Sequence, residues 1–240
     1  RRYDDTKLNR DPANEAVRIS FVPVYTCPSD QNNGQIGLPW TRPANGASNT
    51  TDRYMNGSYR GMGGKCHKSD PTKPDYDPGN TDVWGGYYET EYLPNFRDKP
   101  GWRGPLQTAP VTLPGIADGT STTLLVGERT VRPSQTPEFN RRGTFWADSF
   151  NLYSLSAAWG ESATLLDDYD TCFKVERAIC GSCDNRCKYG WGSPHLGQIN
   201  FVFCDGSVRS LSQGIDMAVF QAMATVAGGP PPAEPIVSGF

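Results

Sequence analysis

The 240-residue chain lacks the features that mark membrane-spanning and nucleic-acid-binding proteins. It contains no run of about 18 apolar residues, so no segment of it is expected to span a membrane. Its net charge is −3 and it has no basic block, which disfavours nucleic acids and anionic membrane surfaces as partners.

Histidine and the motifs of hydrolytic enzymes are equally scarce. The two histidines are His67 and His195, and neither a Gly-x-Ser-x-Gly nor a His-Glu-x-x-His motif occurs. Carboxylates such as Glu128, Asp148 and Glu161 could converge as they do in glycosidases, but no pattern indicates that they do. The chain is therefore predicted not to be an enzyme, with a secreted hydrolase as the least favoured alternative.

Glycine and proline, by contrast, are abundant. The chain has 26 glycines and 20 prolines, and its apolar fraction is 36%. This composition favours short strands joined by ordered turns over long helices. At this length one domain can bury a sizeable core. We expect an α+β fold that is rich in short antiparallel β-strands and ordered loops.

The clearest local pattern is a β-hairpin near the C-terminus. Apolar residues alternate through 198–204, at Ile199, Phe201 and Phe203. Asp205-Gly206 then predicts a two-residue turn, after which 207–211 forms the returning strand.

A helix is predicted after this hairpin. Ser212 or Asp216 can cap its N-terminus, and Gly228-Gly229 followed by Pro230 ends it. Its apolar face consists of Ile215, Val219, Ala222, Met223 and Val226.

Other elements are predicted less directly. Strands are expected at 123–126, at 144–148 and, because apolar residues alternate there, at 17–25. Residues 28–57 are expected to form a polar loop. The glycines at 61, 63 and 64 are interpreted as backbone turns, because the Lys-Ser/Thr of a phosphate-binding loop is missing.

Seven cysteines in a chain of this composition indicate an oxidising compartment. Cys204 is expected to be a buried free thiol, because it falls in the predicted core strand. Cys27 and Cys66 are predicted to form one disulfide. Two more are expected, in one of three connectivities, among Cys172, Cys180, Cys183 and Cys187.

Zinc coordination is the alternative for part of this group. Cys180-x-x-Cys183, Cys187 and His195 offer three thiolates and one imidazole. Structural zinc is usually held by two separated ligand pairs in a reducing compartment, so disulfides are preferred.

Two further sets of polar residues are candidate sites. Asp167, Asp168 and Asp170 could bind calcium, although a solvated acidic turn fits the same residues. Asn49 and Asn56 begin glycosylation sequons, which could equally be polar turns. No cofactor other than this calcium is predicted.

The segment 67–110 is long and aromatic for a loop. Its rings could form a contact surface for a neighbouring subunit or a glycan, or they could cap the sheet. The candidates for such a surface are Trp84, Tyr87, Tyr88, Tyr92 and Trp102.

Four segments together resemble one large bacterial family. They are 22–30 (VPVYTCPSD), 58–64 (SYRGMGG), 117–128 (ADGTSTTLLVGE) and His195 followed after nine residues by Asp205-Gly206. The chain resembles the type IV pilin-like (prepilin-type) proteins of unassigned function that are abundant in planctomycete-type bacteria. It departs from their pattern at Thr122 and Cys204.

The resemblance implies a pilin-like head at 18–229. The long apolar N-terminal helix that polymerises such proteins is not expected among these residues. Residues 1–17 are expected to be an extended arm, and 230–240 an extended proline-rich tail. His195 and Asp205 bracket a strand, about 25 Å apart, so they are expected to stabilise turns rather than to meet.

The function that follows is structural. The chain is predicted to be a subunit of an extracellular or cell-surface filament that assembles from copies of itself, through arms added to a neighbour's sheet edge. The alternative is a monomeric, surface-anchored module that binds a glycan through its aromatic residues.

Overall fold

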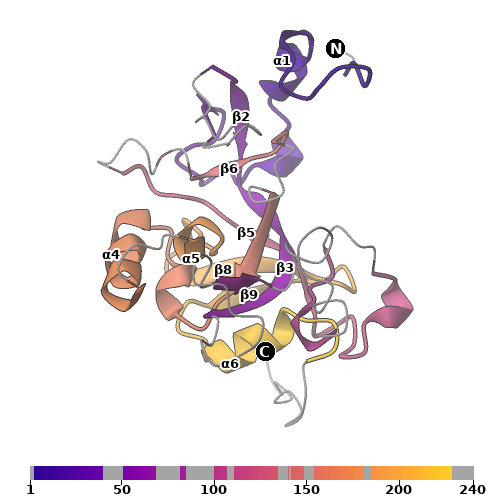
Figure 1. The fold of residues 1–240 in the computed structure, drawn as a ribbon, viewed down its shortest axis with the longest axis vertical. Coiled ribbons are helices and arrows are strands. Elements are labelled where there is room, and N and C mark those ends of the chain that lie inside the picture. Colours follow the sequence, from indigo (N-terminus) through magenta and orange to yellow (C-terminus); the bar gives the residue numbers. More distant parts are fainter. Residues whose placement is uncertain are drawn as a thin grey trace.

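The computed structural model describes most of the chain. The described residues are 3–39, 51–68, 82–84, 100–106, 111–134, 140, 142–148, 154–180 and 185–228. They form a mixed α+β fold with two sheets and four short helices, as predicted (Figure 1). No helix among these residues combines the length and the apolar character that a bilayer crossing requires.

The smaller sheet has three antiparallel strands, in the order β1 (Ile36–Gly37), β2 (Tyr54–Gly57) and β6 (Thr144–Phe145). The larger sheet has the order β4 (Asp82–Trp84), β3 (Tyr59–Lys68), β5 (Leu124–Glu128), β8 (Gln198–Phe203) and β9 (Val208–Ser212). A sixth strand, β7 (Leu155–Ala158), pairs in parallel with β3.

The four helices are α1 (Pro12–Arg18), α4 (Tyr169–Cys180), α5 (Asn185–Lys188) and α6 (Met217–Met223). In Figure 1 the small sheet and α1 lie at one end of the molecule, and α6 lies at the other. Short 3-10 turns lie at η1 (Pro23–Tyr25), η3 (Pro100–Trp102), η4 (Leu113–Gly115) and η5 (Ser162–Leu165).

The main core lies between the large sheet and α6. The ring of Phe201 contacts both Trp191 and Phe220, at centroid distances of 5.1 and 5.8 Å. Gly127 faces the same rings, and a Cβ there would lie 2.7 Å from the Trp191 ring. The alternating residues Ile199, Phe201 and Phe203 are therefore buried, which confirms the predicted face of β8.

The C-terminal hairpin is present where the sequence predicts it, and α6 follows it but ends at Met223, before the predicted stop at Gly228-Gly229. Asp216 caps α6, since its carboxylate accepts hydrogen bonds from the N–H groups of Ala218 and Val219. The turn is one residue longer than expected. The N–H of Phe203 donates a hydrogen bond to the carbonyl of Ser207, and the carbonyl of Phe203 accepts one from the N–H of Gly206. Gly206 alone takes the left-handed conformation (φ +84°), as a three-residue hairpin turn requires.

The glycine-rich segment after Ser58 is a strand, so the prediction of turns there is wrong. It forms the first part of β3, which pairs with β4, β5 and β7. A Cβ at Gly61 would lie within 2.9 Å of Leu106 and Leu155, and Gly64 (φ +111°) lies against the backbone of Trp102. These glycines allow close packing within the sheet rather than reversal of the chain.

The N-terminal segment is not extended, and no strand forms at 17–25. Asp11 caps α1 and Pro12 occupies its first turn, which is a favourable start for a helix. Pro23 begins η1, where its missing N–H costs nothing. The loop predicted at 28–57 also contains the strands β1 and β2.

Candidate functional site

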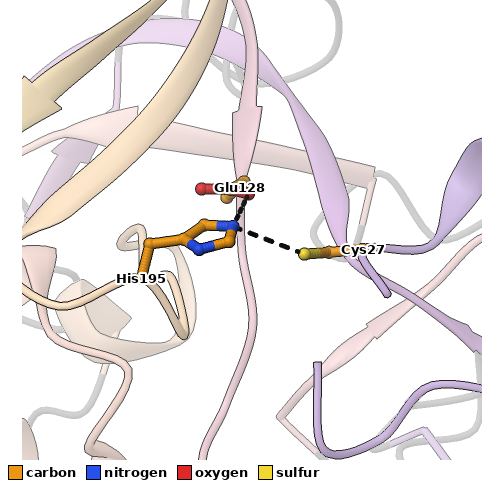
Figure 2. Close-up of side chains that lie close together, drawn as sticks. All are labelled: Cys27, Glu128 and His195. Atoms are coloured by element: carbon orange, nitrogen blue, oxygen red, sulfur yellow. Dashed lines mark hydrogen bonds and ion pairs between the residues drawn. The ribbon is translucent and has the colours of Figure 1, made fainter. Parts of the chain in front are cut away.

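Three side chains from distant parts of the chain converge at one point. Cys27 follows η1, Glu128 ends β5, and His195 precedes β8 (Figure 2). One ligand-type atom from each lies within 4.8 Å of the other two. Among the described residues, this is the one group of three or more His, Cys, Asp or Glu side chains so arranged.

Cys27 is held in place by the start of β3. Its backbone N–H donates a 2.9 Å hydrogen bond to Ser58 Oγ, and that hydroxyl donates a 2.7 Å bond to Asp30. All three residues are buried. The segment 22–30 is thereby fixed to 58–64, the next of the four segments identified in the sequence.

Glu128 is positioned by the β5–β8 pairing. Its side chain is 2% exposed, and its two oxygens accept bonds from the backbone N–H (2.8 Å) and the side-chain amide (3.3 Å) of Asn200. These bonds leave the carboxylate directed toward His195 (Figure 2).

His195 completes the cluster from the surface side, with 40% of its side chain exposed. Its Nε2 atom lies 3.4 Å from Glu128 Oε1 and 3.6 Å from Cys27 Sγ. A thiol–imidazole–carboxylate relay uses one ring nitrogen for the thiol and the other for the acid. Here one nitrogen faces both groups, so the geometry is not that of a relay.

The Cys27 thiol is also poorly suited to act as a nucleophile. Burial raises its pKa, the negative charges of Glu128 and Asp30 raise it further, and the N–H of Ser29 opposes them. The residue as a whole is 3% exposed. Reactive cysteines are exposed and have lowered pKa values, which is the opposite arrangement.

The predicted Cys27–Cys66 disulfide is wrong, because the Cys27 thiol is free. Cys27 is bonded to Ser58 at the start of β3, whereas Cys66 lies near the end of that strand. Eight residues of strand span about 25 Å, far beyond the Cα separation of about 7 Å that a disulfide tolerates.

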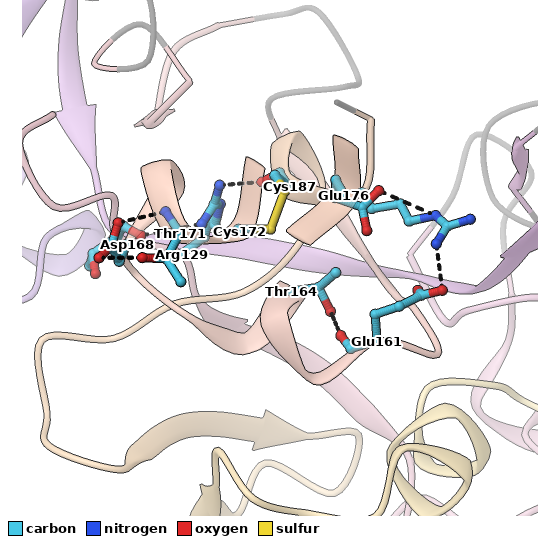
Figure 3. Close-up of a disulfide and its surroundings, with 10 residues drawn as sticks. Arg129, Glu161, Thr164, Asp168, Thr171, Cys172, Glu176 and Cys187 are labelled. Atoms are coloured by element: carbon cyan, nitrogen blue, oxygen red, sulfur yellow. Dashed lines mark hydrogen bonds and ion pairs between the residues drawn. A yellow bond between two sulfur atoms is a disulfide. The ribbon is translucent and has the colours of Figure 1, made fainter. Parts of the chain in front are cut away.

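One disulfide does form within the predicted cysteine group. Cys172 of α4 is bonded to Cys187 of α5, with their Cα atoms 5.8 Å apart (Figure 3). This pairing removes Cys187 from the alternative zinc site, and His195 lies in the other cluster. The side chains of Cys180 and Cys183 lie outside the described residues. Cys204 is free, as predicted, although it is half-buried in the hairpin turn.

A buried arginine supports the disulfide. Arg129 donates a 2.6 Å hydrogen bond to the carbonyl of Cys187 (Figure 3). Its burial lowers its pKa to about 10, while Tyr169 and Asp167 act in the opposite direction. No pattern in the sequence points to this residue, because arginine is seldom found fully buried.

The three aspartates considered for calcium have separate contacts in the structure, and they are not among the described side chains that are grouped like ligands of one ion. Asp168 caps α4 by accepting bonds from the N–H and the hydroxyl of Thr171, both 3.0 Å. Partial burial opposes ionisation, but these bonds lower its pKa overall. Asp167 forms an ion pair with Arg132, and Asp170 lies in the first turn of α4.

The hairpin residue Asp205 has the structural role predicted for it. Its carboxylate accepts bonds from the Ser207 N–H (2.9 Å) and hydroxyl (2.7 Å), and these bonds lower its pKa. The backbone of His195 likewise bonds Ser193 and Gln198 in a turn. The role of the imidazole was missed, because its partners lie far away in sequence.

The other candidates lie mostly beyond the described residues. This is true of Asn49, Tyr87, Tyr88 and Tyr92 and of the side chain of Trp84. Trp102 is half-buried in η3. Asn56 lies in β2 between two paired strands, and the sequon's Ser58 is buried, so this sequon is not the exposed loop that was expected.

A comparison with protein families matches residues 2–218 to SBP_bac_10, described as "Protein of unknown function (DUF1559)". The chain belongs to this family. The matched region contains all three residues of the Cys27–Glu128–His195 cluster. No curated protein and no solved structure gives a significant match. The pilin-like character and the bacterial group remain predictions.

Proposed function

We propose that the chain is a non-enzymatic structural subunit that assembles with copies of itself into an extracellular or cell-surface filament. The observation that carries the proposal is the free edge of the large sheet at β9. Within the described part of the chain, β9 pairs with β8 and with no other strand. An unpaired edge is a natural template for a strand from another molecule.

The register of the hairpin identifies the backbone groups at this edge. At one end of the hairpin the N–H of Phe203 donates a hydrogen bond to the carbonyl of Ser207. At the other end the N–H of Gln213 donates one to the carbonyl of Gly197. Because bonded positions alternate along an antiparallel pair, the backbone groups of Val208, Ser210 and Ser212 point away from β8. Val208 is also 66% exposed, so side chains do not cover this end of the strand.

The proposed occupant is the C-terminal segment 230–240 of a neighbouring copy. Its prolines favour an extended backbone, and Ile236 to Phe240 retain the N–H groups that a ladder needs. The N-terminal segment was the other predicted arm. It is a poorer candidate, because its last six residues lie in the helix α1 and cannot add a strand there.

The burial of the Cys27 thiol and the single shared ring nitrogen of the cluster support a non-enzymatic assignment. Neither feature suits covalent catalysis. A pilin-like head is consistent with a short-stranded α+β fold, and the four motif segments suggest it.

Electron microscopy of purified protein tests the proposal with two matched variants. Ser210→Pro removes an outward N–H without breaking the β8–β9 ladder, whereas Ser210→Ala keeps that N–H. Loss of one hydrogen bond, about 1 kcal/mol, should raise the critical concentration for assembly about fivefold in Ser210→Pro alone.

Deletion of 230–240 should abolish filaments while leaving the circular dichroism spectrum of the folded domain unchanged. Dispersed single particles of the wild-type chain at all concentrations would contradict the proposal. They would favour the alternative of a monomeric module, which a glycan screen of the same sample would then test.

A further inference from the structure

The spacing of the atoms in the Cys27–Glu128–His195 cluster is that of ligands around one ion. Zinc binds sulfur at about 2.3 Å, and nitrogen or oxygen at about 2.0–2.2 Å. At a tetrahedral angle, these bond lengths separate sulfur from nitrogen by about 3.6 Å and nitrogen from oxygen by about 3.4 Å. The observed separations are 3.6 Å and 3.4 Å.

Direct hydrogen bonds explain these two contacts less well than a shared ion does. An N–H donor and a carboxylate oxygen usually lie about 2.7–2.9 Å apart when one of them is charged. The 3.4 Å between His195 and Glu128 is longer. Moreover, one nitrogen in the ring plane cannot direct a single proton to two groups, whereas its lone pair can point at an ion between them.

The donor set also fits zinc rather than calcium or magnesium. A thiolate, an imidazole and a carboxylate are the three ligand types that zinc uses in proteins, whereas calcium and magnesium select oxygen alone. The sulfur of Cys27 and the oxygen of Glu128 lie within 4.8 Å of each other. A shift of about 1 Å would bring them to the separation expected of two ligands on one zinc ion.

The surrounding hydrogen bonds orient two of the three ligands in advance. Asn200 fixes the carboxylate of Glu128, and Ser58 fixes the backbone of Cys27. Such supporting bonds are typical of metal sites. His195 is more exposed and can adjust its ring.

We propose that Cys27 Sγ, Glu128 Oε1 and His195 Nε2 together bind one zinc ion, with a water molecule or another external oxygen donor as the fourth ligand. The ion connects the chain after η1, the end of β5 and the segment before β8. It therefore fixes three of the four motif segments to one another. None of the three ligands belongs to β9, so failure to bind zinc would leave the assembly proposal standing.

Zinc binding is measured by equilibrium dialysis of the intact chain, with its Cys172–Cys187 disulfide oxidised. The wild-type chain is expected to retain one zinc per molecule. His195→Gln removes the most exposed ligand and should fold normally. Loss of a supporting residue costs a metal site about 10–100-fold in affinity, so loss of this ligand should cost at least about 100-fold.

Cys204→Ser is the matched control, because Cys204 is also free but lies in the hairpin turn. It should bind zinc as the wild type does, and Cys27→Ser should not. Co²⁺ supplies an independent readout, since a bound thiolate gives a charge-transfer band that Cys27→Ser should lack.

Retention of zinc by both His195→Gln and Cys27→Ser would overturn the proposal, and so would failure of the wild type to take up zinc. Loss of zinc from Cys204→Ser would place the site elsewhere. Circular dichroism in the presence of a chelator checks that each variant is folded, so that loss of binding is not mistaken for loss of structure.

Discussion

Cysteine side chains contact other parts of the chain in two regions of this molecule, and the two contacts differ in the sequence separation that they span. The Cys172–Cys187 disulfide joins neighbouring helices across a sequence separation of 15 residues. The Cys27–Glu128–His195 cluster joins residues as much as 168 positions apart. The disulfide is therefore a local constraint on α4 and α5, whereas the cluster brings together three segments that are far apart in the sequence.

This difference shows that the role of a cysteine depends on the side chains that surround it in the fold. Cys187 faces a second sulfur, and its carbonyl accepts a bond from buried Arg129. Cys27 faces an imidazole and a carboxylate. Reductant should weaken the first region and chelator the second, and the following variants separate their contributions.

The largest expected effect is loss of the disulfide. Closing a loop of this length stabilises a protein by about 3 kcal/mol in the chain-entropy model. The double variant Cys172→Ala/Cys187→Ala should lose about that much free energy of unfolding, measured by urea denaturation. Its zinc affinity should be unchanged. A loss of zinc binding as large as that of His195→Gln would show that the two regions are not independent.

Ser58→Ala should lower the free energy of unfolding by less, but it should also disturb the Cys27–Glu128–His195 cluster. It leaves the buried N–H of Cys27 without its acceptor and removes the Ser58 donor from Asp30 Oδ2, at a cost of about 1–3 kcal/mol. Unlike the disulfide variant, it should also weaken zinc binding.

Ser121→Ala, which removes a hydroxyl from an exposed position, is the control for Ser58→Ala and should change stability by less than about 0.5 kcal/mol. Equal effects of the two substitutions would contradict the role given to Ser58.

The smallest effect is expected at the cap of α4. Asp168→Ala removes both bonds from Thr171 and should cost about 1 kcal/mol, without effect on zinc binding. Asp170→Ala leaves those bonds intact and should cost less. Thermal unfolding of the two variants distinguishes them, and a smaller loss for Asp168→Ala than for Asp170→Ala would argue against the cap.

The C-terminal hairpin and α6 could be predicted from sequence because their signals are local. Alternation in β8, Gly206 in the turn and Asp216 at the cap each act within a few residues. The strand β3 was missed because the reason for Gly61 is its contact with Leu106 and Leu155, which no local pattern reveals.

The N-terminal error has a different origin. Apolar alternation after Val17 outweighed the helix signal of Asp11-Pro12, and the helix forms. The predicted Cys27–Cys66 disulfide is wrong because β3 carries Cys66 away from Cys27, and no local pattern shows where that strand runs. The cluster itself could not be predicted, because the chain must fold before its three members meet. The one available hint was that each lies in a motif segment.

X-ray absorption at the zinc edge of the zinc-loaded chain tests the central claim most directly. The Cys27–Glu128–His195 site predicts one sulfur at about 2.3 Å and the remaining ligands, nitrogen and oxygen, at about 2.0–2.2 Å. Two or three sulfur ligands would place the ion at the other cysteines, and a shell without sulfur would place it on the surface. Either result would contradict the account.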